Sequence, residues 1–292
     1  MQAKHERRQY KDGSQVWVGK YRNSQNFPHW HYDCELVFVE KGSLNIFCNG
    51  HLLKVSAGRT VFIDSEQIHF LHALTPDATV RQIIFSYDLI KDFAENISLV
   101  SPLLSRDYGT AELYFTLANE FRNRNPFYAN SIICAVQKLM IEIFRNEPFG
   151  LKEKKPDSVD RLKPLMRDIE ENFEFYTLDK AAEFMIMNPA YFSRLFHKLT
   201  GIPFSQYLNS VKVKNAVELL KTRIDLSVTE ISAQCGFATI RNFNRIFKKF
   251  TGYTPSGLPK NFVMKENFTD ADAPDDNPTI VGSELLESSD DF

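Results

Sequence analysis

Three histidines and a glutamate in the first quarter of the chain have side chains that could share one binding site. They are His29, His31, Glu35 and His69, called here the histidine cluster. Residues two apart on an extended strand project to the same face, so His29 and His31 would point the same way. Imidazole nitrogens and a carboxylate can bind a divalent metal, and they can equally hydrogen-bond the hydroxyl groups of a small ligand. We therefore predict a ligand-binding site made of these four residues and Trp30.

Three uses of the histidine cluster stay open: a catalytic metal site, a structural metal site, and a metal-free pocket or packed core. Metal catalysis also needs an open coordination position and supporting partners, which a sequence does not show. We favour the metal-free pocket, with no catalytic residue, no metal and no cofactor. The aromatic residues Phe27, Trp30 and Tyr32 could stack on the ring of a bound sugar.

Short runs of β-branched and aromatic residues surround the histidine cluster and must position it. The expected strands cover residues 17–18, 36–39, 44–47, 52–55, 60–63 and 80–85. Strands of this length, separated by glycine-containing turns at about ten-residue intervals, indicate a sandwich or small barrel. From about Tyr87 the pattern becomes helical, because residues 111–123 and 128–146 are amphipathic. The apolar stripe of the second helix could pack on the barrel or on a partner chain.

Two ten-residue segments, Phe192–Gly201 and Phe243–Gly252, have nearly the same sequence 51 residues apart. Six of the ten positions are identical, and each copy has apolar residues at helical spacing with polar or basic residues between them. One copy alone would indicate only an amphipathic surface helix. Two copies at a fixed offset, each after a short helix and a turn, indicate a pair of helix-turn-helix units.

The residues before each copy supply helix starts and tight turns. Asn188-Pro189 gives an N-cap followed by proline at the first helical position, and Ser227–Glu230 has the capping-box pattern. Gly236 stands where the chain must turn. We also expect Ala182 and Ala233, which are 51 residues apart, to occupy equivalent positions where the helices of each unit cross closely.

Residues 161–262 resemble the DNA-binding domain of the AraC/XylS family of bacterial transcription regulators. The resemblance rests on Asn188–Lys198, Thr200-Gly201, a long connecting helix over 204–220, Glu230–Phe237, Asn242–Lys249 and Thr251–Pro255. Two features depart from the family pattern: Ser232 stands where alanine is usual, and Gly257 and Pro259 interrupt the closing helix. The resemblance implies an all-α domain that binds operator DNA through two helix-turn-helix units.

The histidine cluster in turn resembles the sequence motifs of cupins, in which two histidines, a glutamate and a more distant histidine converge inside a β-barrel. Sensor domains of the AraC/XylS family often keep this pattern as the lining of an effector pocket. The resemblance therefore implies a cupin-like sensor for a small molecule, with a carbohydrate as the leading choice. It also implies a homodimer that activates transcription with RNA polymerase.

The repeat helices carry the residues expected to contact DNA, with arginine first because a bidentate arginine–guanine pair discriminates strongly between bases. The predicted DNA-binding residues are Ser193, Arg194, His197, Arg241, Asn244, Arg245 and Lys248. Residues 161–265 contain 16 Lys/Arg against 9 Asp/Glu, which suits contact with phosphates. Residues 266–292 contain nine Asp/Glu and no Lys or Arg, which predicts a disordered tail that could also compete with DNA.

The N-terminal residues are charged, and no apolar stretch is long enough for a signal peptide or a membrane span. The four cysteines form no CxxC pair, which predicts buried free thiols in a reducing cytoplasm. We therefore expect a cytoplasmic protein without a membrane partner.

At 292 residues the chain is long enough for two domains. We predict a multidomain α+β fold with an N-terminal cupin-like β-barrel plus helices and a C-terminal all-α double helix-turn-helix. The predicted division is a cupin-like sensor at 1–87, a helical dimerisation segment at 88–146, a linker at 147–160, the double helix-turn-helix at 161–262 and an acidic tail at 263–292. The sequence therefore predicts a DNA-binding regulator without enzymatic activity. Its alternatives are a cupin oxygenase or isomerase with a DNA-binding appendage, and an architectural DNA-binding protein that senses nothing.

Overall fold

The computed structural model divides into two compact units, each with its own core. The β-rich unit comprises His5–Lys154 and Asp275–Phe292, and the helical unit comprises Met1–Lys4 and Lys155–Pro274. The residues that the structure describes are 10, 13–26, 28–48, 50–152, 157–223, 225–259, 262 and 283–292. Within these ranges no helix is long and apolar enough to cross a membrane.

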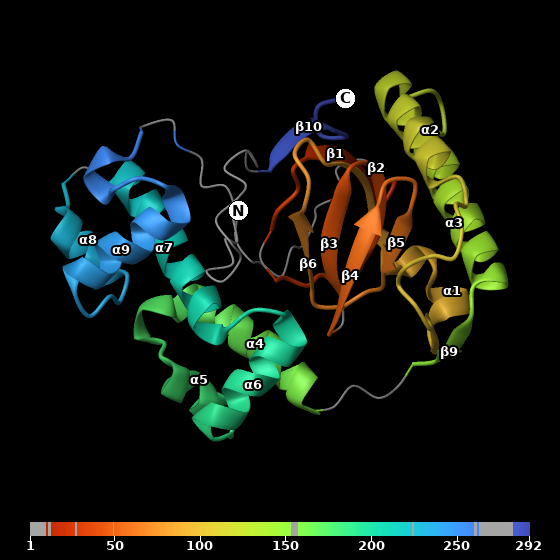
Figure 1. The fold of residues 1–292 in the computed structure, drawn as a ribbon. Helices are drawn as coiled ribbons and strands as arrows, with labels where there is room; N and C mark the ends of the chain where they lie inside the picture. The colour runs from red at the N-terminus through yellow and green to blue at the C-terminus, as the bar shows by residue number, and fades with distance from the viewer. Residues whose placement is uncertain are drawn as a thin grey trace. The chain divides into compact units, whose positions relative to one another are not determined.

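Two antiparallel sheets form the centre of the β-rich unit (Figure 1). The strands are β1 (Val16–Arg22), β2 (Asp33–Lys41), β3 (Ser43–Cys48), β4 (His51–Ser56), β5 (Thr60–Ile63), β6 (His69–Ala73), β7 (Thr79–Ser86), β8 (Ile97–Leu99), β9 (Phe149–Leu151) and β10 (Glu284–Ser288). The larger sheet has the order β10-β1-β7-β2-β5 and the smaller one the order β4-β3-β6, while β8 and β9 pair with each other. All six expected strands are present, which confirms the predicted β-rich N-terminal fold.

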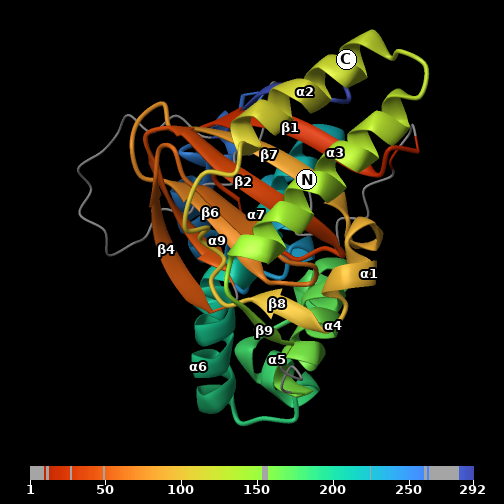
Figure 2. The same ribbon diagram turned by 90° about the vertical axis from the view of Figure 1, so that its right-hand side faces the viewer.

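Both faces of the larger sheet are buried. Neighbouring residues of β2 point to opposite faces, so Val37 packs toward the smaller sheet while Leu36 packs toward the helices. The helices of this unit are η1 (Tyr87–Leu89), α1 (Lys91–Ala94), α2 (Thr110–Asn123) and α3 (Tyr128–Asn146). Figure 2 shows α2 and α3 lying across one face of the sheet. The predicted stripe of α3, which is Ile132, Val136, Leu139 and Ile143, lies in the core on this face.

The predicted linker at 147–160 is too long. Glu147 is buried, and its carboxylate accepts hydrogen bonds from the hydroxyl groups of Ser105 and Tyr108 at 2.6 and 2.8 Å. The next residues form β9, and the first helix of the helical unit begins at Asp157. Hydrogen bonding and strand pairing therefore keep the chain in the β-rich unit beyond the predicted boundary. The other predicted boundaries stay predictions.

The prediction of a disordered acidic tail is wrong for the last residues of the chain. Glu284–Ser288 forms β10, which pairs antiparallel with β1 at the edge of the larger sheet. Composition indicated disorder because these carboxylates lack basic neighbours along the chain, but arginines of the β-rich unit pair with them, beginning with Arg22 and Glu284 at 2.7 Å. The tail residues 263–282 lie outside the described residues.

All four cysteines are free. Cys34, Cys48 and Cys235 are buried as predicted, whereas Cys134 on α3 is exposed, so the prediction of burial is wrong for that residue. Burial raises the pKa of Cys48 and Cys235 to about 12, which keeps both thiols protonated and unreactive at neutral pH.

The helical unit contains two helix-turn-helix pairs joined by one long helix, as predicted. Its elements are α4 (Asp157–Asn172), η2 (Phe173–Phe175), α5 (Leu178–Phe184), α6 (Pro189–Thr200), α7 (Phe204–Thr222), α8 (Val228–Gln234), α9 (Ile240–Thr251) and η3 (Pro255–Gly257). The pairs are α5–α6 and α8–α9, with α7 between them. Where the AraC/XylS family has a closing helix, the described residues contain only the short 3-10 turn η3.

Local capping defines both repeat helices. The Asn188 side chain accepts a hydrogen bond from the backbone N–H of Tyr191 at the start of α6, and Thr239 plays the same part at the start of α9. The capping box of Ser227 and Glu230 starts α8, as the sequence predicted. Equivalent glycines in left-handed conformation follow α6 and α9 and end each helix.

The predicted equivalence of Ala182 and Ala233 is wrong. The first helices of the two pairs begin 50 residues apart, at Leu178 and Val228, whereas the second helices begin 51 apart. The turn of the second pair is therefore one residue longer. Ser232 is buried at the position equivalent to Ala182, while Ala233 is exposed. The small side chain at the close crossing is thus the serine that departs from the family pattern.

We expect Gly236→Ala to destabilise the helical unit strongly. Gly236 has a φ of +68°, and an added Cβ would collide with the backbone carbonyl of Glu174. Gly252 is the matched control, because its φ is +77° but a Cβ there would meet no atom within 4 Å. Left-handed strain alone should cost about 1–2 kcal/mol, and the collision should bring the loss for Gly236→Ala to about 3 kcal/mol or more. Urea denaturation followed by circular dichroism measures both, and equal losses would refute the predicted collision.

Candidate functional site

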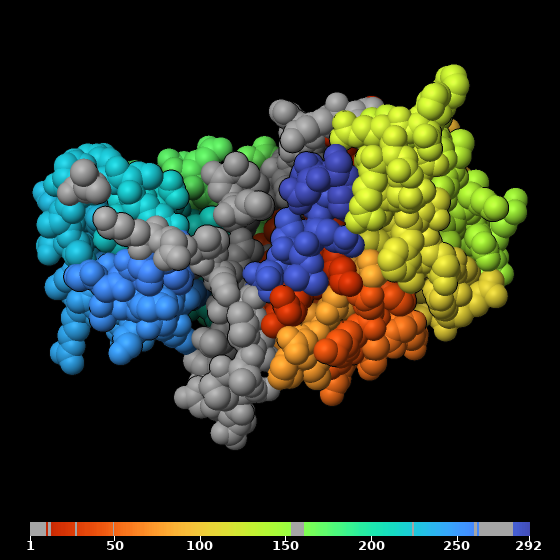
Figure 3. All heavy atoms as spheres, turned by 90° about the horizontal axis from the view of Figure 1, so that it is seen from above, coloured from red at the N-terminus to blue at the C-terminus, as the bar shows by residue number. Residues whose placement is uncertain are grey.

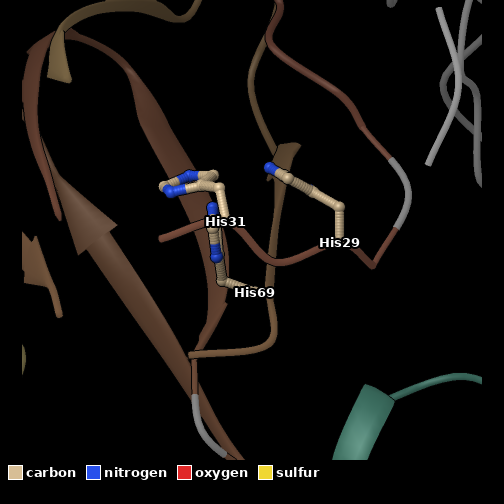
Figure 4. Close-up of side chains that lie close together, drawn as sticks. All are labelled: His29, His31 and His69. Carbon is tan, nitrogen blue, oxygen red and sulfur yellow. The ribbon is translucent and has the colours of Figure 1, made fainter. Parts of the chain in front are cut away.

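The histidine cluster is assembled from sequence-distant segments of the β-rich unit. His69 is the first residue of β6, and its backbone pairs with that of His29 in an isolated bridge. His31 lies two residues before the start of β2, and Glu35 lies on that strand. Figure 4 shows the three imidazoles lying close together. The structure thus brings the four predicted residues into one site.

The rings are packed at short distances. The centroids of His29 and His69 are 4.2 Å apart, and those of His31 and His69 are 4.9 Å apart. One ring nitrogen from each histidine can be chosen so that the three nitrogens lie within 4.8 Å of one another. The Glu35 Oε2 atom lies 3.5 Å from Nε2 of His31 and 3.4 Å from Nε2 of His69. His31, Glu35 and His69 are all buried, so water competes little with these contacts.

Backbone carbonyls orient two of the imidazoles. The Nδ1 atom of His31 lies 2.8 Å from the carbonyl oxygen of Asp33, and Nδ1 of His69 lies 2.9 Å from that of Gln67. A carbonyl oxygen only accepts hydrogen bonds, so each Nδ1 must carry the proton. The opposite Nε2 atoms then face the Glu35 carboxylate. Among the described residues neither Nε2 atom nor Glu35 Oε1 makes a hydrogen bond, so the site presents polar atoms that a ligand could satisfy.

Charge in the cluster is set by Glu35. Burial alone would raise the pKa of the Glu35 carboxyl group, but the close polar contacts with His31 and His69 and the charge of these imidazoles outweigh it and hold this pKa well below its usual range. Burial lowers the pKa of His31, but the close contact with Glu35 and the charge of its carboxylate outweigh burial and leave this pKa raised. Glu35 is therefore a buried anion at neutral pH.

This arrangement can bind a ligand in two chemically distinct ways. Hydroxyl groups of a small molecule could donate to Glu35 and accept from or donate to the imidazoles. Alternatively, three imidazoles and one carboxylate, with two rings oriented by backbone carbonyls, fit a divalent transition metal. A metal bound by His29, His31, Glu35 and His69 would supply a Lewis acid. The residues fit both a metal-free pocket and a metal site.

The predicted aromatic lining is only partly tested by the geometry. The Trp30 ring is buried and meets the Tyr32 ring edge-on at 5.4 Å, while Tyr32 is 46% exposed. Phe27 lies outside the described residues. The role of Trp30 as a ligand contact stays a prediction.

The second candidate site is the outer face of α9. Phe243, Ile246 and Phe247 are buried in the core of the helical unit. The side chains predicted to bind DNA are all exposed on this helix, namely Arg241, Asn244, Arg245 and Lys248. These positions recur at helical spacing, so they form one polar stripe that is free to enter a DNA groove.

The corresponding face of α6 is less polar. Phe192 and Phe196 are buried, and Arg194 and His197 are exposed as predicted. Ser193 is only partly exposed, because it lines a small hollow of about 170 Å³ together with residues at the start of α7. Tyr191 is 48% exposed at the first turn of this helix, so it is a further candidate for a DNA contact.

Asn242 is a second residue that the sequence reading missed. Its Oδ1 atom accepts a hydrogen bond of 2.9 Å from Nη2 of Arg245, while its backbone N–H is used by the Thr239 cap. The side-chain contact fixes the direction of the arginine before any DNA is bound. The spacing of three residues on one helix was the signal available in the sequence.

Two family models match separate parts of this chain. Residues 19–115 match the AraC-like ligand binding domain, and residues 181–261 match a helix-turn-helix domain. The first match covers strands and helices of the β-rich unit, including the histidine cluster. The second covers both repeat helices.

Curated relatives match over different lengths. The uncharacterized transcriptional regulatory protein YesN of Bacillus subtilis is 43% identical over 77 residues, which are 26% of this chain and only 21% of YesN. The HTH-type transcriptional activator RhaS of Escherichia coli O139:H28 is 25% identical over 250 residues, which are 80% of this chain and 87% of RhaS. Among solved structures, ToxT from Vibrio cholerae O395 is 15% identical, with a TM-score of 0.42 over 83% of this chain and 96% of ToxT.

We expect Glu35→Gln to destabilise the β-rich unit in a pH-dependent way when chelator is present. The pKa of Glu35 is lower in the folded chain than in the unfolded chain, where it is about 4.3. Glu35 therefore stabilises the fold at pH values above about 4.3, and this stabilisation is lost as pH falls through the folded pKa. The pKa of His31 is higher in the folded chain than in the unfolded chain, where it is about 6.5. His31 therefore stabilises the fold at pH values below about 6.5, and this stabilisation is lost as pH rises through the folded pKa. The stabilisation is therefore greatest between about pH 4.5 and 6.5, where removing one partner should cost about 3 kcal/mol.

Urea denaturation followed by tryptophan fluorescence measures this loss, because both Trp17 and Trp30 lie in the β-rich unit. Glu95→Gln, at an exposed carboxylate, is the matched control. The same loss at pH 5.5 and pH 9 would mean that the pair contributes through packing alone.

Proposed function

Because this chain belongs to the AraC/XylS family of transcription regulators, with an AraC-like ligand-binding domain followed by a helix-turn-helix domain, we propose that it is a sequence-specific DNA-binding regulator controlled by a small molecule. The observation that carries this proposal is the doubled helix-turn-helix in one helical unit, with exposed Arg194 and Arg245 at equivalent places on α6 and α9. DNA binding would place the protein with the chromosome in the cytoplasm.

Each repeat helix is anchored so that its polar face can be presented to DNA. On α6, the rings of Phe192 and Phe196 pack against Phe204 of α7 at centroid distances of 5.1 and 5.2 Å. On α9, Phe243 packs against Phe237 and Phe247 at 5.1 and 5.4 Å. These rings, edge-on between α6 and α7 and tilted on the buried face of α9, fill the core beneath each helix and so hold its orientation. A rigid scaffold with two exposed polar helices supports groove binding at two places.

The histidine cluster supports the effector part of the proposal. A sugar carries several hydroxyl groups, and the buried Glu35 anion with its imidazole neighbours offers both acceptors and donors for them. Binding would shift the population between two arrangements of the DNA-binding units in a homodimer, in proportion to the difference in effector affinity. We propose that the bound state activates transcription through RNA polymerase.

The two alternative functions are less well supported. A metal-dependent enzyme fits the histidine cluster, but the curated relatives that match this chain are transcription regulators. An architectural DNA-binding protein would not need the AraC-like ligand-binding domain that matches residues 19–115. A thermal-shift screen over mono- and disaccharides separates this last case, because a saturating effector should stabilise the β-rich unit by about 3 kcal/mol.

We expect Arg245→Ala to weaken binding to the specific operator at least about tenfold, because a bidentate arginine–guanine contact contributes about 1–3 kcal/mol of base discrimination. Asn242→Ala should weaken it less, because the arginine remains but loses its orienting hydrogen bond. Gel-shift titrations on operator and random DNA measure both variants, with Lys221→Ala as a control at an exposed lysine in the last turn of α7. If Arg245→Ala weakened both DNAs equally, Arg245 would be a phosphate contact.

The spacing of the two helix-turn-helix units predicts two contacts on one DNA face. The recognition helices of such units read successive major-groove segments about 34 Å apart. Hydroxyl-radical footprinting of the full chain should therefore show, for each DNA-binding unit, two protected clusters one helical turn apart. Protection of a single cluster that disappears with Arg245→Ala and persists with Arg194→Ala would mean that α6 is structural only.

We expect His31→Ala to abolish the effector response and to leave basal operator binding nearly unchanged. The substitution removes a polar group from the pocket, while the helical unit keeps its own core. The measurement is operator affinity with and without the effector found by screening. Chelator should leave the unmutated protein fully responsive. A chelator effect that mimics His31→Ala would instead establish a metal, and a normal response of the variant would exclude His31 from the pocket.

A further inference from the structure

The acidic segment 283–292 occupies a built site on the β-rich unit. Its strand β10 extends the larger sheet beyond β1, pairing from Gly19 opposite Ser288 to Arg22 opposite Glu284, with a register shift between Lys20 and Tyr21. Figure 3 shows the segment in blue, lying between red residues of the N-terminal strand and yellow residues of α2. The segment therefore covers a sheet edge whose unpaired backbone groups would otherwise be open to other chains.

Glu287 is the centre of this contact. Its carboxylate accepts hydrogen bonds from Nη2 of Arg122 at 2.9 Å and from the hydroxyl group of Tyr114 at 3.1 Å. Nη1 of Arg81 lies 3.6 Å away, and the Arg81 side chain is only 5% exposed. The Arg81 guanidinium also lies over the rings of Tyr114 and Phe115, with its carbon 4.7 and 4.2 Å from their centroids. Two arginines and a tyrosine thus form a carboxylate pocket.

Two further contacts extend the site along the strand. The indole N–H of Trp17 donates a hydrogen bond of 3.1 Å to Oδ2 of Asp290. The exposed side chains of Arg22 and Glu284 form an ion pair at 2.7 Å.

The end of the segment is held by two arginines of the helical pair α2–α3 and its turn. The Phe292 ring lies under the Arg122 guanidinium, 4.2 Å from its carbon, and the carbonyl oxygen of Phe292 accepts a hydrogen bond of 3.0 Å from Arg124. Phe292 also packs against the core between the sheet and α2–α3. The arginines Arg22, Arg81, Arg122 and Arg124 of the receptor surface face a segment whose charged side chains are all acidic, and Arg81 also pairs with Glu40 of its own unit at 2.6 Å. The two surfaces are therefore complementary in charge and hydrogen bonding.

We propose that residues 283–292 are an intramolecular ligand of the β-rich unit, bound by strand addition and by the Arg81–Tyr114–Arg122 carboxylate pocket. Extended peptides are commonly recognised in this way, with main-chain hydrogen bonds supplying affinity and side-chain pockets supplying specificity. The chain passes from the β-rich unit into the helical unit after Lys154, and β10 brings it back. The helical residues 157–259 are therefore connected to the β-rich unit both before and after them in the chain. Release of the segment removes the second of these two connections.

The direct test uses a fluorescent peptide with the sequence of residues 283–292 and the full chain from which these residues are deleted. The peptide should bind the deleted chain and should not bind the intact chain, whose site is occupied. A peptide with Glu287→Gln should bind at least about tenfold more weakly, because it loses charge-assisted hydrogen bonds. A peptide with Glu284→Gln is the matched control and should lose less than about fivefold, because it loses only an exposed ion pair. Equal binding of all three peptides would overturn the pocket assignment.

A second variant keeps the proposal testable if the deletion does not fold. In the intact chain, Glu287→Gln should speed removal of the last residues by carboxypeptidase and change the Trp17 fluorescence, whereas Glu284→Gln should leave both near those of the unmutated protein. Unchanged digestion and fluorescence for Glu287→Gln would refute the docked segment.

The consequence for DNA binding rests on the proposed function. With the second connection released, the deletion and Glu287→Gln should both change operator affinity with and without effector in the same direction. If the peptide bound the deleted chain but operator affinity did not change in either variant, the binding site would be established and its regulatory role would be excluded. If the unmutated chain bound no operator DNA, the proposed function would be wrong, while the peptide result would still stand.

Discussion

The need to bury both faces of the larger sheet organises the β-rich unit. A strand whose two faces are both covered must carry apolar residues at consecutive positions, and β2 does so at Leu36 and Val37. One face meets the smaller sheet and the other meets α2 and α3. The histidine cluster is held at the start of β2 and of β6, where strand pairing fixes the backbone on either side of it. A cluster with this much buried charge is stable only in such a rigid frame.

Features determined by residues close in sequence were predicted well. The stripe of α3, the N-cap at Asn188 and the capping box at Ser227 depend on periodicity or on side chains a few residues apart, and each is present. The members of the histidine cluster could also be named, because their types are rare and their spacing is distinctive. Their tautomers could not be, because these depend on the carbonyls of Asp33 and Gln67 and on local folding.

Features determined by distant or irregular contacts were missed. The extra residue in the turn before α9 shifts the alignment of the two repeats, so Ser232 and not Ala233 takes the buried position. Composition predicted a disordered tail because Glu287 has no basic neighbour nearby in sequence; its partners Arg81 and Arg122 are 206 and 165 residues away. Pairing over such separations is specified by the tertiary fold and leaves no local pattern.

The two sites of the β-rich unit share one ladder of the larger sheet. Glu35 on β2 pairs with Ile84 on β7, and three residues further along β2, Phe38 pairs with Arg81. A ligand that draws Glu35 toward itself acts on the strand pair that also carries the carboxylate pocket for Glu287. Packed strands transmit such displacements because their interiors have little free volume. Coupling between two sites is a free energy that acts reciprocally on both. Effector affinity should therefore differ between the intact chain, in which residues 283–292 are docked, and the chain that lacks them. The effector should change the affinity of the deleted chain for the peptide by the same factor.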